Sequence, residues 1–200
     1  MLWQMVQSTS PESLKAELRR TALARRDVLP ADARAAAAEA IAARPFPLEI
    51  KPGVIVSGYS PMRSEINPLP LMRKLTGAGA YLALPMVAGR GQPLIMRAWT
   101  FGEPLVRGVW GIREPALDAP EVLPDILLVP LAAFDRQGHR IGYGAGYFDL
   151  TIAKFKAMKP VIAIGIAFAA QEIKQVPATP RDEMLDLVLT EREVIDCRKA

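Results

Sequence analysis

The feature that most constrains the fold of this chain is an alternation of short apolar runs with segments of helical pattern. Gly53–Tyr59 is apolar and rich in β-branched residues, and Ile126–Phe134 is a nearly continuous apolar run; both patterns are typical of buried strands in a parallel sheet. Further strands are predicted at Tyr81–Val87, Ile95–Trp99, Pro160–Phe168 and Leu185–Thr190, with Val106–Ile112 as another candidate and Leu185–Thr190 closing the sheet. The alternation predicts an α/β three-layer domain with a mainly parallel central sheet flanked by helices.

Helices are predicted before the first strand and between later ones. The first begins at Thr9 or Ser10, because Pro11 suits a first helical turn and Glu12 complements the helix dipole, and it runs to about Val28. Three more helices are predicted over residues 31–43, 69–75 and 147–158.

The composition fits one globular domain. The sequence has 200 residues, of which 50% are hydrophobic and 23% charged, so we expect a single domain over residues 11–200 and a mobile tail at residues 1–10. Cys197 is the only cysteine in the sequence, which excludes a disulfide framework and a cysteine-based zinc site and predicts a cytoplasmic location. The longest apolar stretch, Val161–Ala170, is far shorter than a membrane-spanning helix requires.

The net charge of +4 is spread along the chain, and no run rich in lysine and arginine occurs. Nucleic-acid binding normally needs a basic stripe, so this pattern argues against a nucleic-acid partner. A small anionic ligand that meets a few placed cations fits better. We expect small-molecule substrates, neither nucleic acid nor membrane as a partner, and a monomer in preference to an oligomer, although the sequence leaves the oligomeric state open.

A glycine-rich segment is the most informative part of the chain. Within Leu127–Leu150, a predicted buried strand runs into a loop over Gly138–Gly146, and a helix follows. Glycines let backbone N–H groups approach an anion, a helix N-terminus adds partial positive charge, and Arg140 supplies a forked cation for phosphate. The spacing is neither a Walker pattern nor a GxGxxG fingerprint. The segment therefore predicts phosphate binding, with a simple strand-to-helix turn as the alternative.

Acidic residues near this segment could hold a cation. Asp149, in the first turn of the predicted helix, either compensates the helix dipole or binds magnesium beside the phosphates. Asp182 and Asp186 form a second acidic pair before the last predicted strand, where they either face solvent or bring another carboxylate to the same metal. His139 lacks a second histidine for a metal site or a triad, and we interpret it as an exposed loop residue.

Other polar and aromatic residues also allow two interpretations. Lys15 and Arg19 lie one turn apart on the first helix, with Arg26 on the same face, and form either a solvated surface or a clamp for a nucleotide tail. Glu65 is either an exposed loop acid or an acceptor for the N–H groups of a heterocycle. Trp110 is either a core residue or a stacking platform for a planar ligand.

Several motifs together resemble the 5-formyltetrahydrofolate cyclo-ligase family, and the resemblance covers nearly the whole chain after about Pro11. Its most specific part is VPLAAFDRQGHRIGYGAGYFD at residues 129–149, which is similar to the family signature VPGLAFD..G.RLG.G.GYYD. Supporting motifs are K-x3-R at residues 15–19, Y-x-P-x3-E at residues 59–65, WGIREP at residues 110–115 and IGIAFAAQ at residues 164–171.

The resemblance implies an irreversible ATP- and Mg²⁺-dependent cyclisation of 5-formyltetrahydrofolate to 5,10-methenyltetrahydrofolate through a phosphorylated formyl group. It assigns ATP binding to Lys15, Arg19, Arg140, Gly142, Tyr143, Gly144, Ala145, Gly146 and Tyr147, with Lys15 and Arg140 as catalytic residues. It assigns the folate to Tyr59, Glu65, Trp110 and Tyr147, and magnesium to Asp149 and Asp186.

The chain departs from the family pattern at several positions. Ala145 replaces a common glycine, Phe148 replaces the second tyrosine of the signature, and Leu150 replaces a residue that is often arginine. Pro68 stands near a usual threonine, and Arg181 replaces a common histidine. The alternative function is therefore a nucleotide- or folate-binding protein without catalysis, and a third option is another small ATP-dependent ligase.

Overall fold

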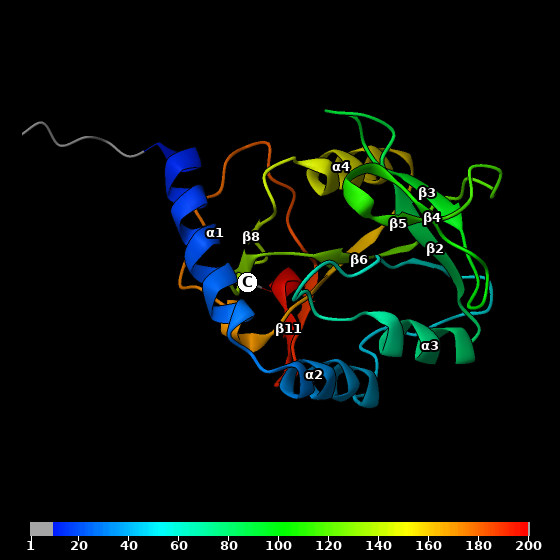
Figure 1. The fold of residues 1–200 in the computed structure, drawn as a ribbon, viewed down its shortest axis with the longest axis horizontal. Helices are drawn as coiled ribbons and strands as arrows, with labels where there is room; N and C mark the ends of the chain where they lie inside the picture. Colours follow the sequence, from blue (N-terminus) through cyan, green and yellow to red (C-terminus); the bar gives the residue numbers. More distant parts are fainter. Residues whose placement is uncertain (1–9, 200) are drawn as a thin grey trace, which may run out of the picture.

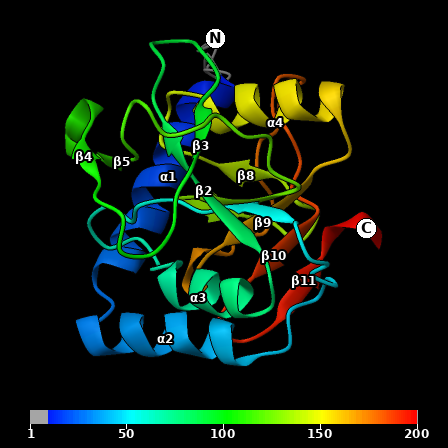
Figure 2. The same cartoon turned by 90° about the vertical axis from the view of Figure 1, so that its right-hand side faces the viewer.

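A computed structural model describes residues 10–199, and its largest element is a seven-stranded sheet (Figures 1 and 2). The strands of this sheet, in chain order, are β1 (Ile55–Ser57), β2 (Tyr81–Met86), β3 (Ile95–Ala98), β6 (Ile126–Pro130), β9 (Ile162–Ile166), β10 (Leu187–Leu189) and β11 (Val194–Asp196). Their spatial order is β11-β10-β9-β6-β1-β2-β3. The predicted strands at these places are confirmed, and most are shorter than their apolar runs.

The sheet is parallel at its centre and antiparallel at both edges. Strands β10, β9, β6, β1 and β2 run parallel to one another, whereas β3 runs antiparallel to β2. The prediction that Leu185–Thr190 closes the sheet is wrong, because β11 pairs antiparallel with β10 on its outer side. The chain can add β11 without a crossover helix, since a short turn suffices to reverse direction between antiparallel strands.

Helices cover both faces of the sheet, which confirms the predicted three-layer α/β fold. Helices α2 (Ala31–Ala43) and α3 (Leu69–Gly77) lie on one face, and α4 (Tyr147–Met158) lies on the other (Figure 1). Two clusters of buried apolar side chains correspond to these two interfaces. Within residues 10–199, no helix is both long enough and apolar enough to cross a membrane.

The first helix, α1 (Pro11–Asp27), lies beside the sheet instead of over it (Figure 1). Ser10 caps this helix by accepting a hydrogen bond from the backbone N–H of Ser13 at 3.2 Å. Its buried face meets a small separate cluster that includes Ala22, Ala133, Ile141 and Val176. The predicted tail at residues 1–10 lies outside the described residues except for Ser10.

Two small hairpins interrupt the regions predicted as a long strand and a loop. Strands β7 (Ala133–Phe134) and β8 (Arg140–Ile141) form one hairpin, so the apolar run 126–134 breaks after Pro130 and the glycine-rich segment contains a strand. Strands β4 (Val106–Arg107) and β5 (Arg113–Glu114) form the other, joined through the 3-10 turn η1 (Val109–Gly111). The candidate strand at 106–112 is therefore a hairpin arm and its turn.

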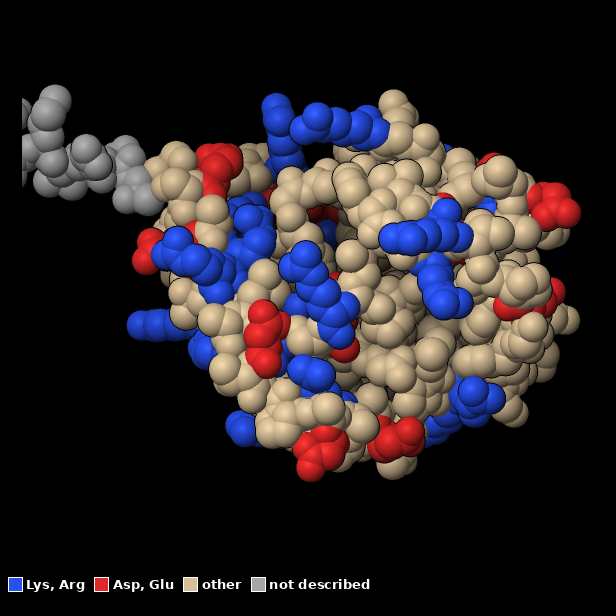
Figure 3. Space-filling view, in the orientation of Figure 1, with Lys and Arg blue, Asp and Glu red and all other residues tan. Residues whose placement is uncertain are grey.

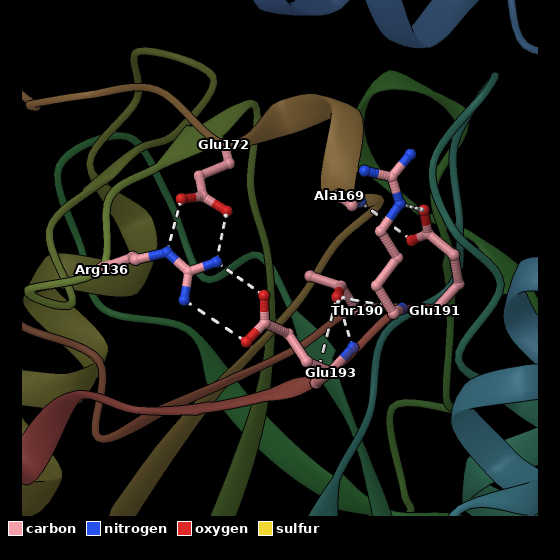
Figure 4. A network of polar contacts seen from close by, with 7 residues as sticks. Arg136, Ala169, Glu172, Thr190, Glu191 and Glu193 are labelled. Carbon is pink, nitrogen blue, oxygen red and sulfur yellow. Dashed lines mark hydrogen bonds and ion pairs between the residues drawn. The ribbon is translucent and has the colours of Figure 1, made fainter.

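An exposed arginine joins the β7–β8 turn to two distant segments. Arg136 donates two hydrogen bonds to Glu172, which follows the 3-10 turn η2 (Ala169–Gln171), and two to Glu193, next to β11 (Figure 4). The last described residues form the 3-10 turn η3 (Cys197–Lys199). The Arg136 contacts fix the outer end of the hairpin that carries Arg140.

The topology marks the carboxyl ends of β1 and β6 as the point where a ligand is expected. The chain passes from β1 through α3 to β2 on one side, and from β6 through α4 to β9 on the other. Connections that diverge in opposite directions leave an opening between the two strands, and ligands of open α/β sheets bind at such points. The segments after Ser57 and after Pro130 lead into the predicted site residues.

Candidate functional site

Helix α1 contacts the glycine-rich loop that leads into α4. The Arg19 Nε–H donates a hydrogen bond to the carbonyl oxygen of Gly142 at 2.6 Å. Gly144 and Gly146 have φ of +102° and +69°, in the region that favours glycine, and Gly146 is the N-cap of α4. Ala145 between them does not adopt a positive φ, so its methyl group is compatible with the loop. The loop therefore keeps its curvature despite the alanine.

Lys15 lies one turn before Arg19 on α1 and is the second cation on this side of the helix. Its Nζ lies 2.5 Å from Oδ2 of Asp182, and the two side chains are only 14% and 16% exposed. Burial alone raises the pKa of the Asp182 carboxyl, but hydrogen bonds from Lys15 and Thr179 lower it below its ordinary value. The interpretation of Lys15 and Arg19 as a solvated helix face is therefore wrong.

Arg140 and Asp149 form a buried ion pair at the start of α4. An Arg140 terminal N–H lies 2.7 Å from Oδ1 of Asp149, and the other terminal nitrogen donates to the carbonyl oxygen of Glu183 at 2.5 Å. The same Asp149 oxygen accepts a hydrogen bond from the backbone N–H of Glu183. The Arg140 side chain is 4% exposed, so its guanidinium is held in place by these partners. Asp149 has a second carboxylate oxygen available for a cation.

The two acids before β10 have different surroundings. Asp182 meets Lys15, whereas Asp186 accepts a hydrogen bond from the backbone N–H of Ala163 on β9 at 2.8 Å. Among the described residues, no three histidine, cysteine, aspartate or glutamate side chains lie close enough together to form a metal site from protein ligands alone. Magnesium bound to phosphates commonly uses only one or two carboxylates, so Asp149 at the helix start fits such a role.

The loop after β1 supplies the candidate folate residues. Tyr59 is buried, and its hydroxyl donates to the carbonyl oxygen of Ile66 at 2.8 Å. Oε2 of Glu65 accepts a hydrogen bond from the backbone N–H of Met62 at 2.7 Å. Burial raises the pKa of Glu65, while Met62, Tyr143 and Arg26 oppose this rise. Glu65 is thus a half-buried carboxylate and not a fully exposed loop acid.

Arg26 contacts both the loop after β1 and the glycine-rich loop, and no role was assigned to it from the sequence. Its guanidinium donates to Oγ of Ser64 at 2.9 Å and to the hydroxyl of Tyr143 at 2.6 Å. The available signal was its position on the same helical face as Lys15 and Arg19. The side chain of Tyr143 therefore points to Arg26, although its backbone belongs to the glycine-rich loop.

Trp110 projects from η1 and partly covers Tyr147, the first residue of α4. The two ring centroids are 5.8 Å apart at 49°, and Trp110 is 65% exposed. Its φ of +55° is rare for a bulky residue and marks local strain. The interpretation of Trp110 as a core residue is therefore wrong. The other interpretation, a stacking platform for a planar ligand, is compatible with its exposure.

His139 and Cys197, for which the sequence predicts no catalytic role, are both at least half-buried. His139 is half-buried with its Nδ1 3.3 Å from the Asp135 carboxylate, so its description as an exposed loop residue is wrong. The turn of β7–β8 wraps around Asp135, which accepts the backbone N–H of His139. Cys197 is buried, and burial raises its pKa to about 11, which disfavours the thiolate form a nucleophile needs.

The charge distribution supports a site for an anion beside α1. In the space-filling view, lysine and arginine side chains lie over α1 and border the recess next to it, where acidic atoms are visible (Figure 3). A separate surface pocket of about 290 Å³ is lined by residues that include Trp99, Glu103 and Pro115. None of the predicted site residues lines that pocket.

Comparisons with known proteins agree with the resemblance. The model of the 5-formyltetrahydrofolate cyclo-ligase family matches residues 11–191. The chain is 34% identical over 197 residues to a 5-formyltetrahydrofolate cyclo-ligase of Mycolicibacterium smegmatis, covering 93% of this chain and 97% of the relative. It is 33% identical over 136 residues to the Escherichia coli K12 protein of the same name, covering 65% of this chain and 74% of the relative.

A solved structure also matches over nearly the whole length. The NMR structure of the Aquifex aeolicus 5,10-methenyltetrahydrofolate synthetase superimposes with a TM-score of 0.75. The two sequences are 27% identical, and the match covers 94% of each chain. The same sheet and flanking helices therefore occur in both proteins.

Proposed function

Because the chain belongs to the 5-formyltetrahydrofolate cyclo-ligase family, we propose that it uses ATP and Mg²⁺ to convert 5-formyltetrahydrofolate to 5,10-methenyltetrahydrofolate, releasing ADP and phosphate. We propose that residues 11–200 act as one catalytic domain. The observation that carries the proposal is the contact of Arg19 with the carbonyl of Gly142, beside which Lys15 is held by Asp182. Cations on one helix thus border a glycine loop at the start of another helix.

The chemical problem of the proposed reaction is a poor leaving group. The oxygen of a formamide does not leave readily, so the formyl carbon is a weak electrophile. In the proposed first step, this oxygen attacks the γ-phosphorus of ATP and ADP leaves. N10 of the folate then attacks the formyl carbon, the carbon–oxygen bond breaks, phosphate departs and N10 loses its proton. The product contains the methenyl bridge between N5 and N10.

Such a reaction depends on positioning and charge neutralisation more than on a protein nucleophile. We assign Lys15 and Arg19 to the triphosphate, and the backbone N–H groups of residues 142–147 to its orientation. The N-terminus of α4 adds partial positive charge at the same place. Arg140, held by Asp149 and Glu183, contributes a fixed positive charge at the base of the loop.

Magnesium would be held by Asp149, and we retain Asp186 as the second proposed ligand. The fit of Asp149 rests on its position in the first turn of α4 and on its second carboxylate oxygen beyond the one that Arg140 and Glu183 use. When bound, the ion supplies positive charge to the phosphate oxygens. Arg140 orients the Asp149 carboxylate for this purpose.

The folate is assigned to the crevice between the loop after β1 and the β4–β5 hairpin. Glu65 would accept hydrogen bonds from the pterin, since its carboxylate is half-buried and fixed by the backbone of Met62. Trp110 and Tyr147 offer aromatic surfaces to a planar ring. Buried Tyr59 supports this loop from below through its bond to Ile66.

The decisive experiment is a direct assay of product formation. Purified protein is mixed with Mg-ATP and 5-formyltetrahydrofolate, and absorbance is followed at the methenyl-folate band. We expect a rise that requires ATP, is absent with a non-hydrolysable ATP analogue and is strongly reduced in a Lys15→Ala/Arg19→Ala variant. Binding of ATP without any such rise favours the non-catalytic alternative. ATP hydrolysis that ignores all reduced folates favours a different small ligase.

A further inference from the structure

The environment of Arg26 is unusual for a buried cation. The residue is 3% exposed, yet the groups that accept its hydrogen bonds are the neutral hydroxyls of Ser64 and Tyr143. Asp27, whose side chain is 60% exposed, forms a loose ion pair with Arg26 at 3.8 Å from its Nε and accepts a hydrogen bond from the Ser64 hydroxyl, so the buried charge is only partly offset. Burying a charge is costly unless it is well paired, so a guanidinium in such a place calls for a further reason.

Three segments of the site meet at this one guanidinium. Arg26 lies in the last turn of α1, Ser64 precedes Glu65 in the loop after β1, and Tyr143 belongs to the glycine-rich loop. The guanidinium carbon also lies 5.8 Å from the centre of the Tyr143 ring. Arg26 thereby ties the segment proposed for the folate to the segment proposed for the nucleotide.

Tyr143 extends this connection to Glu65. Because its hydroxyl oxygen accepts a hydrogen bond from Arg26, its proton remains available to a further acceptor. In the structure this hydroxyl donates to the carbonyl oxygen of Leu131 at 3.3 Å, a long contact, and it lies close enough to the Glu65 carboxyl to lower the pKa of that group. A hydroxyl that receives a bond from a cation becomes a stronger donor. Tyr143 as a whole is 46% exposed, but its hydroxyl contacts Arg26 of α1.

We propose that Arg26 and Tyr143 are positioning residues that hold the Glu65 carboxylate ready for the pterin and so couple the glycine-rich loop to folate binding. This inference rests on the proposed function, since that function assigns Glu65 to the folate. The backbone N–H of Met62 fixes one oxygen of Glu65, and Tyr143 with Arg26 behind it restrains the carboxylate from the opposite loop.

The arrangement also predicts how the affinity for the folate depends on pH when Tyr143 is replaced. The ionisable groups around Glu65 are Arg26 with Asp27 beside it on α1, Tyr143 on the glycine loop, and Tyr59 after β1. Arg63, two residues before Glu65, is exposed. Burial raises the pKa of Glu65, and Tyr143 and Arg26 lower it. Removing the phenol hydroxyl therefore makes Glu65 take up a proton at higher pH. Folate binding, which needs the carboxylate, should then weaken further as the pH falls.

The test compares Tyr143→Phe, Arg26→Lys, Glu65→Gln and the Tyr143→Phe/Glu65→Gln double variant with the unchanged protein. KM values for 5-formyltetrahydrofolate and ATP are measured between pH 6 and 8. Loss of one hydrogen bond in the site predicts a folate KM raised about five- to tenfold in Tyr143→Phe and Arg26→Lys, with an ATP KM changed less than about twofold. The rise in Tyr143→Phe should be larger at pH 6 than at pH 8.

Controls separate positioning from general damage. Tyr81→Phe changes an exposed tyrosine on β2, and Arg25→Lys changes the exposed arginine next to Arg26, so neither should alter either KM. In the Glu65→Gln background, Tyr143→Phe should add little, because its target carboxylate is gone. Equal effects on both KM values, an undiminished effect in that background, or a pH-independent effect would each overturn the inference.

Direct binding keeps this test apart from the proposed reaction. The Kd for 5-formyltetrahydrofolate is measured by tryptophan fluorescence with the same variants and no ATP. If the unchanged protein binds the folate but forms no product, the proposed reaction is wrong and the Kd values still decide the roles of Arg26 and Tyr143. If it binds no reduced folate, both proposals fall.

Discussion

The ammonium group of Lys15 lies 2.5 Å from the carboxylate of Asp182, although 167 residues separate them in the chain. This contact brings the first helix to the segment that precedes β10. The backbone and side-chain hydroxyl of Thr179 also donate to this carboxylate. Asp182 therefore orients the lysine. Under the proposed function, the triphosphate of ATP would draw the Lys15 ammonium group away from the Asp182 carboxylate and toward itself.

Replacement of Lys15 by alanine tests its assignment to ATP. Hydrogen bonds to charged groups contribute about 1.5–3 kcal/mol, so we expect Lys15→Ala to raise the KM for ATP by about ten- to a hundredfold. The KM for the folate should change much less. Steady-state kinetics with each substrate varied in turn measures both values. Arg20→Ala, at an exposed position on the same helix, is the matched control. Similar increases in both KM values would remove the assignment.

Magnesium titrations distinguish the two proposed carboxylate ligands. We expect Asp149→Asn to raise the Mg²⁺ concentration for half-maximal rate by about tenfold, because a neutral amide is a weaker ligand for a hard cation. Asp186→Asn should have the same effect if Asp186 also binds the ion. If Asp186 serves only the backbone of Ala163, its replacement should lower the melting temperature and leave the magnesium dependence unchanged.

Three substitutions of Trp110 separate the contribution of its aromatic ring from that of its backbone conformation. Both Trp110→Ala and Trp110→Gly remove the aromatic surface and should raise the folate KM, whereas Trp110→Phe should largely preserve it. The φ of +55° favours glycine, so Trp110→Gly should be more stable than Trp110→Ala by about 1 kcal/mol. Urea unfolding measures this difference. Equal stability of the two variants would show that the turn relaxes to an ordinary conformation.

The Arg136 ion pairs predict a stability effect that depends on salt and pH. Arg136→Ala should lower the melting temperature slightly at neutral pH, and 1 M NaCl should reduce the difference because exposed charges are screened. The hydrogen bond from Arg136 holds the pKa of Glu193 below its ordinary value in the folded state. A lowered folded-state pKa means stability that is present at neutral pH and lost as the pH falls.

The melting temperatures of Arg136→Ala and the unchanged protein should therefore converge as the solution is acidified below about pH 4. Arg192→Ala is a useful control, since this guanidinium is 77% exposed and its nearest carboxylate oxygen is 3.8 Å away. A constant difference between Arg136→Ala and the unchanged protein at all pH values would mean that Arg136 acts through packing and not through its charge.

Strong local patterns made much of the fold predictable. The helix predicted over 31–43 occurs with these bounds, and that over 147–158 does also, because alanine-rich composition and a glycine boundary are local signals. Strand β11 was missed, since Val194–Asp196 is short and partly polar, and its strand conformation depends on its pairing with β10. The hairpins β4–β5 and β7–β8 were also hidden, because each strand has two residues and no periodicity to detect.

The site was predictable as a set of residues and not as a set of contacts. The motifs indicated Lys15, Arg19 and the glycine loop, and the structure brings these together. No pattern could show that Tyr143 turns its hydroxyl toward Arg26, because that contact spans 117 residues and depends on how α1 lies against the loop. The burial of His139 likewise depends on how the β7–β8 turn wraps around Asp135.

Helix α1 carries three cations of the site, yet apolar packing attaches it only through the small cluster around Ala22, apart from the two faces of the sheet. Much of its attachment is polar and comes from side-chain contacts with the loops of the candidate site. Such an element can detach while the rest of the protein stays folded, at a lower free energy than global unfolding. Its amide protons should exchange with solvent sooner than those of α4, and Mg-ATP should slow that exchange in α1 first. Under the proposed function, the helix would report nucleotide occupancy through its own docking equilibrium.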